Sequence, residues 1–224
     1  MRREAPVNIA LISDTHFQTN DAFTAENWDA VRRWIAATQP DFVIHLGDIT
    51  ANGLHDPAEL MHARDVLATG DVEMLCLPGN HDVGDHAPAG GLHAEEPLGV
   101  FLHKPLFRDR ADEDVIHTRY VPAVPRQRLL ASLQKRDLRF VAAGHTHQMR
   151  QLRASGVEHV WVPSTAFTLP DSFQERIGAK CVGIMTLALT PDTHRFTLIV
   201  PNGMKNRSLL EFAHVYPGVT RLPR

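Results

Sequence analysis

Five short apolar runs, each ending in a polar segment that contains Asp, Asn or His, constrain the fold of this chain more than any other feature. The runs cover residues 7–12, 42–46, 72–77, 100–103 and 138–142. Runs of this length between polar turns are typical of strands that are buried on both faces. Helical patterns lie between most of them, so the sequence predicts an α/β fold with parallel strands.

Three helices are expected between these runs. The first should have Thr24 as its cap, and the second should have Asp56 as its cap and Pro57 at the first helical position. Gly70 is placed to end the second helix, and the third should begin at Pro125. The residues expected to face the core are Trp28, Val31 and Ile35 in the first helix, Leu60, Ala63 and Leu67 in the second, and Leu129, Leu130 and Leu133 in the third.

The C-terminal third has a different pattern. Apolar runs at residues 157–162, 181–189 and 194–200 have no convincing helix between them, which predicts antiparallel strands. No linker marks a domain boundary, so residues 1–224 are expected to form a single domain.

Composition excludes several functional classes. Hydrophobic residues make up 43% of the chain. The formal net charge is -3, so the protein has no overall positive charge that would attract nucleic acid or anionic lipid. No stretch approaches the roughly 20 apolar residues of a membrane helix, and no signal peptide is recognisable. Cys76 and Cys181 lie in apolar runs and are expected to be buried thiols in a reducing compartment. A cytoplasmic protein without a membrane partner is therefore expected.

Residues suited to bind metal ions gather where the predicted strands end. Because ligands bind beyond the carboxyl ends of parallel strands, these side chains should converge on one rim. Carboxylate, amide and imidazole donors without a thiolate suit Mn, Fe, Zn, Co or Ni. Seven such ligands are too many for one ion and would serve two ions that share a carboxylate. These seven are Asp14, His16, Asp48, Asn80, His103, His145 and His147.

Each motif alone has an ordinary structural explanation. Asp14 could form a strand-end turn, the pair at residues 47–48 is a common turn, and His16 or His103 could be a partly buried histidine with satisfied hydrogen bonds. The ordered set, with each motif placed after its own predicted strand, favours a functional site over these explanations.

The same motifs resemble those of the calcineurin-like metallophosphoesterase superfamily. The matching segments are residues 14–16, 47–48, 79–82, 103 and 144–147, and residues 163–165 resemble a segment of class III cyclic nucleotide phosphodiesterases. The resemblance implies an αββα sandwich with a parallel N-terminal half and antiparallel C-terminal strands. It also implies a binuclear metal-dependent phosphoesterase in which a bridging hydroxide attacks phosphorus.

The resemblance further implies a role for each matched residue. Asp14, His16 and His147 would hold one ion, Asn80, His103 and His145 would hold the other, and Asp48 would bridge the two. The catalytic residues would be His81, which protonates the departing alkoxide, and Asp82, which orients the His81 imidazole.

The chain is shorter than the family pattern between residues 83 and 97. Gly84, Pro88, Gly90, Gly91 and Pro97 make a helix improbable there, so this connection is expected to be a loop. This shorter connection leads directly to His103, whose assignment as a ligand depends on it. The alternatives to it are His86, His93 and His117.

The favoured substrate is a small phosphodiester, such as a cyclic nucleotide. Lys104 is the one cation that the strand-end motifs add, which is little for the second charge of a monoester. Arg108 or Arg110 folding over the rim would instead allow a phosphomonoesterase. A non-catalytic, metal-binding interaction module on the same fold is the other alternative, and the sequence also allows a homodimer.

Overall fold

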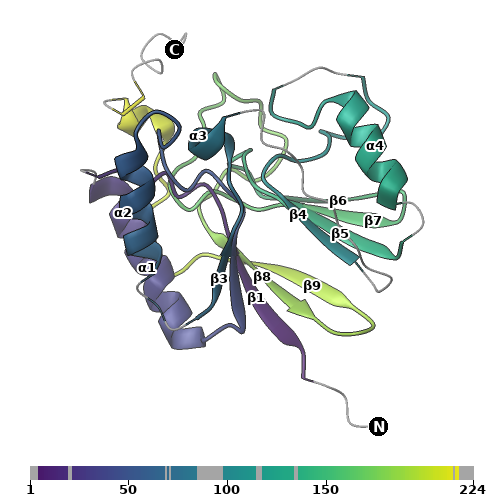
Figure 1. Ribbon diagram of the computed structural model, residues 1–224, viewed down its shortest axis with the longest axis horizontal. Coiled ribbons are helices and arrows are strands. Elements are labelled where there is room, and N and C mark those ends of the chain that lie inside the picture. The colour runs from purple at the N-terminus through teal and green to yellow at the C-terminus, as the bar shows by residue number, and fades with distance from the viewer. Residues whose placement is uncertain are drawn as a thin grey trace.

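The computed structural model consists of two β-sheets packed face to face, with helices on both outer faces (Figure 1). It describes residues 5–19, 22–68, 70, 72–84, 98–114, 118–133, 136–213 and 215–216. The expected α/β sandwich is thus confirmed. The connection expected to be a loop lies outside the described residues from position 85 to position 97.

The first sheet has the strand order β3-β2-β1-β8-β9. Strands β1, β2 and β3 are parallel, whereas β8 is antiparallel to both β1 and β9. The sequence therefore predicted the directions of these strands correctly. Their bounds are Val7–Ile12 for β1, Phe42–His45 for β2, Met74–Cys76 for β3, Ile184–Leu189 for β8 and His194–Ile199 for β9.

The second sheet has the order β4-β5-β7-β6. Its strands are Leu98–Leu102, Leu138–Ala143, Arg150–Ala154 and Val157–Trp161 for β4, β5, β6 and β7. Strands β4 and β5 are parallel and lie in this second sheet rather than beside β3. Strand β7 is antiparallel to β6, as expected for the C-terminal third, but parallel to β5. The hairpin partner β6 alternates in burial and was not predicted.

Strand β1 is apolar along its length because each of its faces packs against a different layer. Ile9 and Leu11 belong to the core between the two sheets. Ala10 and Ile12 belong to a second core under the helices. Successive side chains of a strand point to opposite faces, so both faces of β1 must be apolar.

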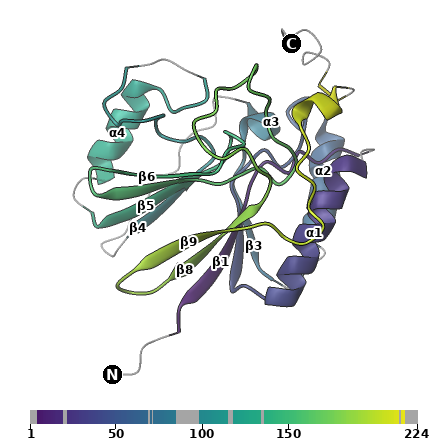
Figure 2. The ribbon, with the colours of Figure 1, turned by 180° about the vertical axis from the view of Figure 1, so that it is seen from behind.

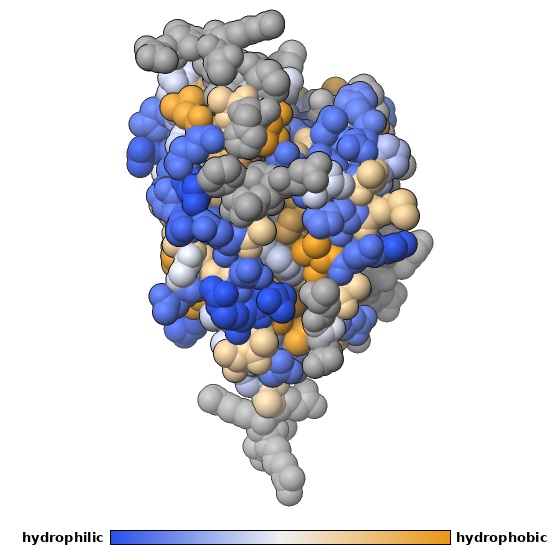
Figure 3. Space-filling model, turned by 90° about the vertical axis from the view of Figure 1, so that its left-hand side faces the viewer, coloured by the Kyte–Doolittle hydropathy of each residue, from blue (hydrophilic) through white to orange (hydrophobic). Residues whose placement is uncertain are grey.

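The helices α1 (Ala22–Thr38) and α2 (Pro57–Leu67) cover the outer face of the first sheet (Figure 2). Asp56 caps α2 as predicted, since its side chain accepts a hydrogen bond from the Ala58 amide at 3.0 Å. Thr24 does not cap α1, because the helix already begins at Ala22 and the Thr24 side chain is buried. Figure 3 shows that the side of the molecule on which α1 and α2 lie is largely hydrophilic, with small separate apolar areas.

The remaining helices are α3 (Asn80–Val83), α4 (Ala123–Leu133) and the 3-10 helix η1 (Leu209–Phe212). Helix α4 covers the outer face of the second sheet through Leu133. In both ribbon views η1 lies beside one end of α2, at the same end of the molecule as α3 (Figures 1 and 2).

Both cysteines are free thiols, but they are not buried as expected. Cys76 is exposed and Cys181 is half-buried. Cys76 ends β3, which is an edge strand of its sheet. In the part of the chain that the structure describes, no helix is long and apolar enough to cross a membrane.

His159 of β7 should make the stability of the fold depend on pH. It is buried against the Phe107 ring, and burial lowers its pKa from 6.5 to about 4. Between these pH values the unfolded chain takes up a proton that the folded chain excludes, so stability falls as pH falls. We expect His159→Leu to remove up to about 3 kcal/mol of this dependence, measured by urea unfolding from pH 7 to pH 4.

The exposed His55 provides the control, because His55→Leu removes a histidine without changing the core. An unchanged pH dependence in His159→Leu would contradict this interpretation.

Candidate metal centre

Two clusters of acid and imidazole groups lie where the strands end. Asp14, His16 and His147 form one cluster, and Asp48, His103 and His145 form the other, with the potential ligand atoms of each within 4.8 Å of one another. The side chain of Asn80 joins the second cluster, since its Oδ1 lies 3.2 Å from His103 Nε2. The structure thus brings together all seven residues that the sequence suggested as ligands.

The clusters adjoin each other. Asp14 of the first cluster accepts a hydrogen bond through Oδ2 from the backbone amide of His145 in the second, at 3.0 Å. His16, Asp48, His145 and His147 also line the same cavity. Two ions held by these clusters would therefore be neighbours.

Hydrogen bonds at Nδ1 fix the orientation of three of these imidazoles. His147 Nδ1 donates to the Phe167 carbonyl at 2.8 Å, and His103 Nδ1 donates to the Leu46 carbonyl at 2.8 Å. His16 Nδ1 pairs with the hydroxyl of Tyr216 at 2.7 Å. Histidines that bind metals are held in this way, because a partner at one ring nitrogen leaves the other free for the ion.

The backbone is unusual at the same positions. Asp14, His16, Asp48, His145 and His147 all have positive φ angles, between 48° and 66°. Such angles are uncommon for residues other than glycine and cluster at functional sites. The left-handed conformation turns the chain sharply after β1, β2 and β5, where these side chains enter the site.

Close contacts between loops explain the glycine of one motif. A Cβ atom on Gly79 would collide with the backbone nitrogen and the carboxylate of Asp48. Glycine is therefore required at this position because two ligand loops touch there.

Charge in the clusters is balanced between carboxylates and imidazoles. Burial would raise the pKa of Asp14, but His147, whose Nε2 lies 3.3 Å from Asp14 Oδ1, holds that pKa well below its usual value. Burial would lower the pKa of His103, but Asp48 at 3.3 Å raises it to about 9. Burial lowers the pKa of His145 to about 4. Each carboxylate is thus paired with an imidazole, and a metal cation bound there would displace any proton on that imidazole and keep the imidazole as a ligand.

The residues of both clusters fit metal ions. Asp14 Oδ1 is buried, and its near neighbour among the described residues is His147 Nε2 at 3.3 Å rather than a well-aligned hydrogen-bond donor. His16 Nε2 lies 3.3 Å from His147 Nε2, and His103 Nε2 lies 3.1 Å from His145 Nδ1, so ring nitrogens converge in pairs. Two groups of convergent nitrogen and oxygen donors fit the two-ion site expected from the sequence.

His81 lies beside the clusters, but Asp82 does not hold its ring. The Ala51 carbonyl lies 2.6 Å from His81 Nδ1 and holds the ring instead, which leaves Nε2 available in the cavity. The carboxylate of Asp82 accepts hydrogen bonds from the amides of Ile49, Thr50 and Gly79. Its role is therefore to bind the loop after β2 to the start of α3.

Several residues that support the site were not singled out from the sequence. His45 accepts a hydrogen bond from the Gly47 amide and pairs with Thr15 Oγ1 at 2.9 Å. Tyr216 contacts His16 from a position 200 residues further along the chain. The apolar neighbours of His45 concealed its role, and no sequence motif marks Tyr216.

The segment at residues 163–165 supports a metal-site loop from behind. Ser164 Oγ donates to the Asp14 carbonyl at 2.9 Å, and the Thr165 amide donates to the Ser13 carbonyl at 3.0 Å. This segment therefore positions the strand end that carries Asp14.

Two members of each cluster line one cavity, whose volume is about 630 Å³. Arg108 and Arg110 are not among its lining residues, since Arg108 pairs with Glu175 and Arg110 with Asp112. Arg119 lines it instead.

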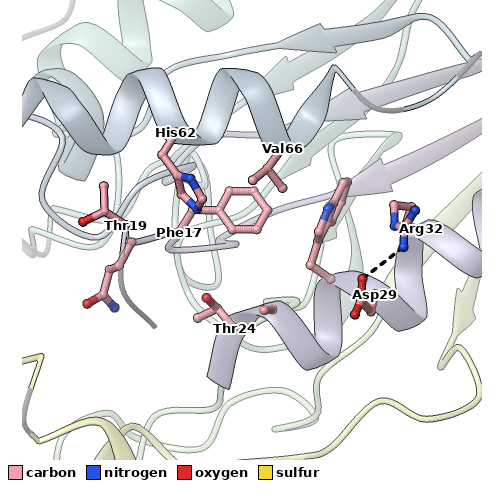
Figure 4. Close-up of a pocket in the computed structure, with 10 residues that line it drawn as sticks. Phe17, Thr19, Thr24, Asp29, Arg32, His62 and Val66 are labelled. Atoms are coloured by element: carbon pink, nitrogen blue, oxygen red, sulfur yellow. Dashed lines mark hydrogen bonds and ion pairs between the residues drawn. The ribbon is translucent and has the colours of Figure 1, made fainter. Parts of the chain in front are cut away.

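Another cavity, of about 410 Å³, lies between α1 and α2 (Figure 4). Phe17 and His62 lie on its walls, and the charged groups of Asp29 and Arg32 pair with each other. It contains neither metal cluster, so the larger cavity is the candidate active site.

The comparison with protein families decides the assignment. The model of the calcineurin-like phosphoesterase family matches residues 7–149, which include every residue of both clusters. The chain belongs to the calcineurin-like phosphoesterase family. A comparison with curated protein sequences yields no match.

Solved structures of other proteins have the same fold as this chain at low sequence identity. A dimetal phosphatase from Danio rerio is 15% identical, with a TM-score of 0.61, over 86% of this chain and 96% of that one. GAP50, the anchor in the inner membrane complex of Plasmodium, is 11% identical, with a TM-score of 0.64, over 99% of this chain and 96% of that one. Vps29 from Chaetomium thermophilum is 11% identical, with a TM-score of 0.50, over 88% and 96%.

Asp82 should contribute more to stability than to the orientation of His81. Asp82→Ala would leave the amides of Ile49, Thr50 and Gly79 without their acceptor. We expect it to lower the free energy of unfolding by about 3 kcal/mol, measured by chemical denaturation.

Asp65, whose carboxylate is exposed on α2, gives a control through Asp65→Ala. If Asp82→Ala kept the stability of the parent protein and lost only turnover, the ring-orienting role would be correct instead.

Proposed function

We propose that this protein is a phosphoesterase that requires two metal ions and that acts on a phosphodiester of nucleotide type. The observation that carries the proposal is that members of both clusters line one cavity together with His81. Two bound ions, which we propose to be Mn, Fe or Zn, would activate water and neutralise charge on the phosphoryl oxygens.

His81 is suited to donate a proton to the leaving oxygen. The Ala51 carbonyl holds its Nδ1, so Nε2 is the nitrogen that can deliver a proton into the cavity. The backbone amide of His81 also donates to Asp48 Oδ1 at 2.9 Å, which fixes the acid next to the second cluster. A sugar alkoxide is a poor leaving group, so its departure benefits from such an acid.

The cations around the cavity support a diester over a monoester. Lys104 Nζ donates to the Thr118 carbonyl, and Arg108 and Arg110 bind carboxylates away from the cavity. Arg119 is the one arginine among the described lining residues, and it donates to the Phe173 carbonyl. The monoanion of a diester needs less positive charge than the dianion of a monoester.

An interaction module is the second candidate function, because GAP50 shares the fold and is described as an anchor. Both clusters and His81 are nevertheless present here, and a protein without catalysis has no need of a proton donor in the cavity. We therefore favour the enzyme. We place it in the cytoplasm, where both thiols would stay reduced.

The proposal is tested by loading the protein with Mn, Fe or Zn and measuring metal content and hydrolysis together. We expect two ions per chain, because there are two clusters. We also expect kcat/KM for bis(p-nitrophenyl) phosphate to exceed that for p-nitrophenyl phosphate by about tenfold, because there are few cations for a dianion.

His147→Ala removes a member of the first cluster only and is expected to halve the metal content. Two bound ions without hydrolysis of either ester would favour the interaction module. A preference for the monoester would overturn the diester assignment and leave the phosphoesterase standing.

His81→Ala should separate proton donation from metal binding. We expect metal content to be kept, because the His81 side chain belongs to neither cluster. Turnover of an alkyl ester should fall by about two to four orders of magnitude, the range for a lost general acid. The loss should be much smaller for a nitrophenyl ester, whose leaving group departs without a proton.

His55→Ala is the matched control, since His55 is an exposed histidine that does not line the cavity with the two clusters. An equal loss for alkyl and nitrophenyl esters would remove His81 from the acid role.

A further inference from the structure

One wall of the candidate active-site cavity has no role in the reaction proposed at the two clusters of Asp and His residues. Its lining residues Phe167, Leu169, Phe173, Leu209 and Val215 are apolar. They come from the loop after β7 and from the C-terminal segment that contains η1. A phosphate group on the clusters would therefore have an apolar surface beside it.

This wall is built onto the metal site. The Phe167 ring lies 5.0 Å from the ring of His16 and 4.8 Å from the ring of His147, measured between centroids. It also lies 4.9 Å from the ring of Phe212, which is fully buried. The apolar wall and the clusters thus form one packed unit, so the position of the wall relative to a bound phosphate is fixed.

Phe173 is the exposed member of this wall. Its side chain is 39% exposed, whereas Phe167, Leu169 and Leu209 are buried. The guanidinium of Arg119 lies 5.3 Å from the centroid of the Phe173 ring, and its Nη2 donates to the Phe173 carbonyl at 2.7 Å. Arg119 therefore holds Phe173 at the cavity by a hydrogen bond and by a cation–π contact.

We propose that Phe173 and Arg119 form a specificity platform that binds an aromatic, nucleobase-sized substituent of the phosphodiester. Planar aromatic and guanidinium groups stack on bases, and the cavity of about 630 Å³ is within the size range of ligand pockets. Leu169 and Val215 complete the apolar surroundings of the base. This inference rests on the proposed function, because it places the phosphate at the clusters.

The test uses three diesters that share a p-nitrophenyl leaving group and differ in the other substituent: thymidine 5′-yl, octyl and methyl. We expect kcat/KM to be highest for the thymidine ester, by at least about tenfold over the methyl ester, because stacking on an aromatic side chain has this magnitude. Phe173→Ala should lower the ratio of thymidine to methyl ester about tenfold, chiefly through KM. Phe173→Trp should retain the preference.

Phe42→Ala is the matched control, since Phe42 is 36% exposed but lies at the start of β2 and outside this cavity. Equal kcat/KM for all three esters, or an unchanged ratio in Phe173→Ala, would overturn the platform. A preference for the octyl ester would instead indicate a site for an alkyl chain.

A binding measurement keeps the platform testable without turnover. We expect calorimetry on the metal-loaded protein to show AMP binding about tenfold more tightly than ribose 5-phosphate, and Phe173→Ala to remove the difference. Equal affinities would overturn the inference. The absence of hydrolysis of all three esters would contradict the proposed function alone.

Discussion

Two carboxylates buried among imidazoles are the constraint on which the rest of the structure depends. The side chains of Asp14 and Asp48 are almost fully shielded from water, so they must meet positive charge inside the protein. The imidazole of His147 lies 3.3 Å from Asp14 and that of His103 lies 3.3 Å from Asp48, and each lowers the pKa of its carboxylate. Several features, including the sandwich of two sheets, the left-handed turns and the carbonyl acceptors behind the imidazoles, serve to bring these charges together.

Meeting that constraint has consequences for the backbone. The residues with positive φ angles have a strained backbone, and Gly79 and Asp48 approach each other unusually closely. An isolated chain would favour neither arrangement. Compensating interactions therefore surround the site. Asp82 joins two ligand loops, Ser164 supports the Asp14 loop from below, and His45 joins the ends of β1 and β2 through Thr15. The same interactions therefore hold the candidate metal site in place and stabilise the ends of the strands.

Much of the site could be predicted from the sequence because its signals are local. Each motif follows its own apolar strand, and strand ends are recognisable from a few residues. The assignment of β4 to a second sheet could not be predicted, since pairing between distant strands leaves no local mark. The partner of His81 was missed for a similar reason, because the acceptor is the Ala51 carbonyl and every residue has a carbonyl.

The position of β1 in the centre of its sheet bears on how the protein is made. One neighbour, β2, follows soon in the sequence, but the other, β8, extends to Leu189. At translation rates of about 5–20 residues per second, β1 leaves the ribosome roughly 10 to 35 seconds before β8 is complete. During that interval one edge of β1 is an unpaired template for other chains. A nascent chain cut after residue 149 would carry every residue of both clusters and still lack the strands that close this edge. Chaperones that shield strand edges should therefore matter more to its yield than the composition of the mature protein suggests.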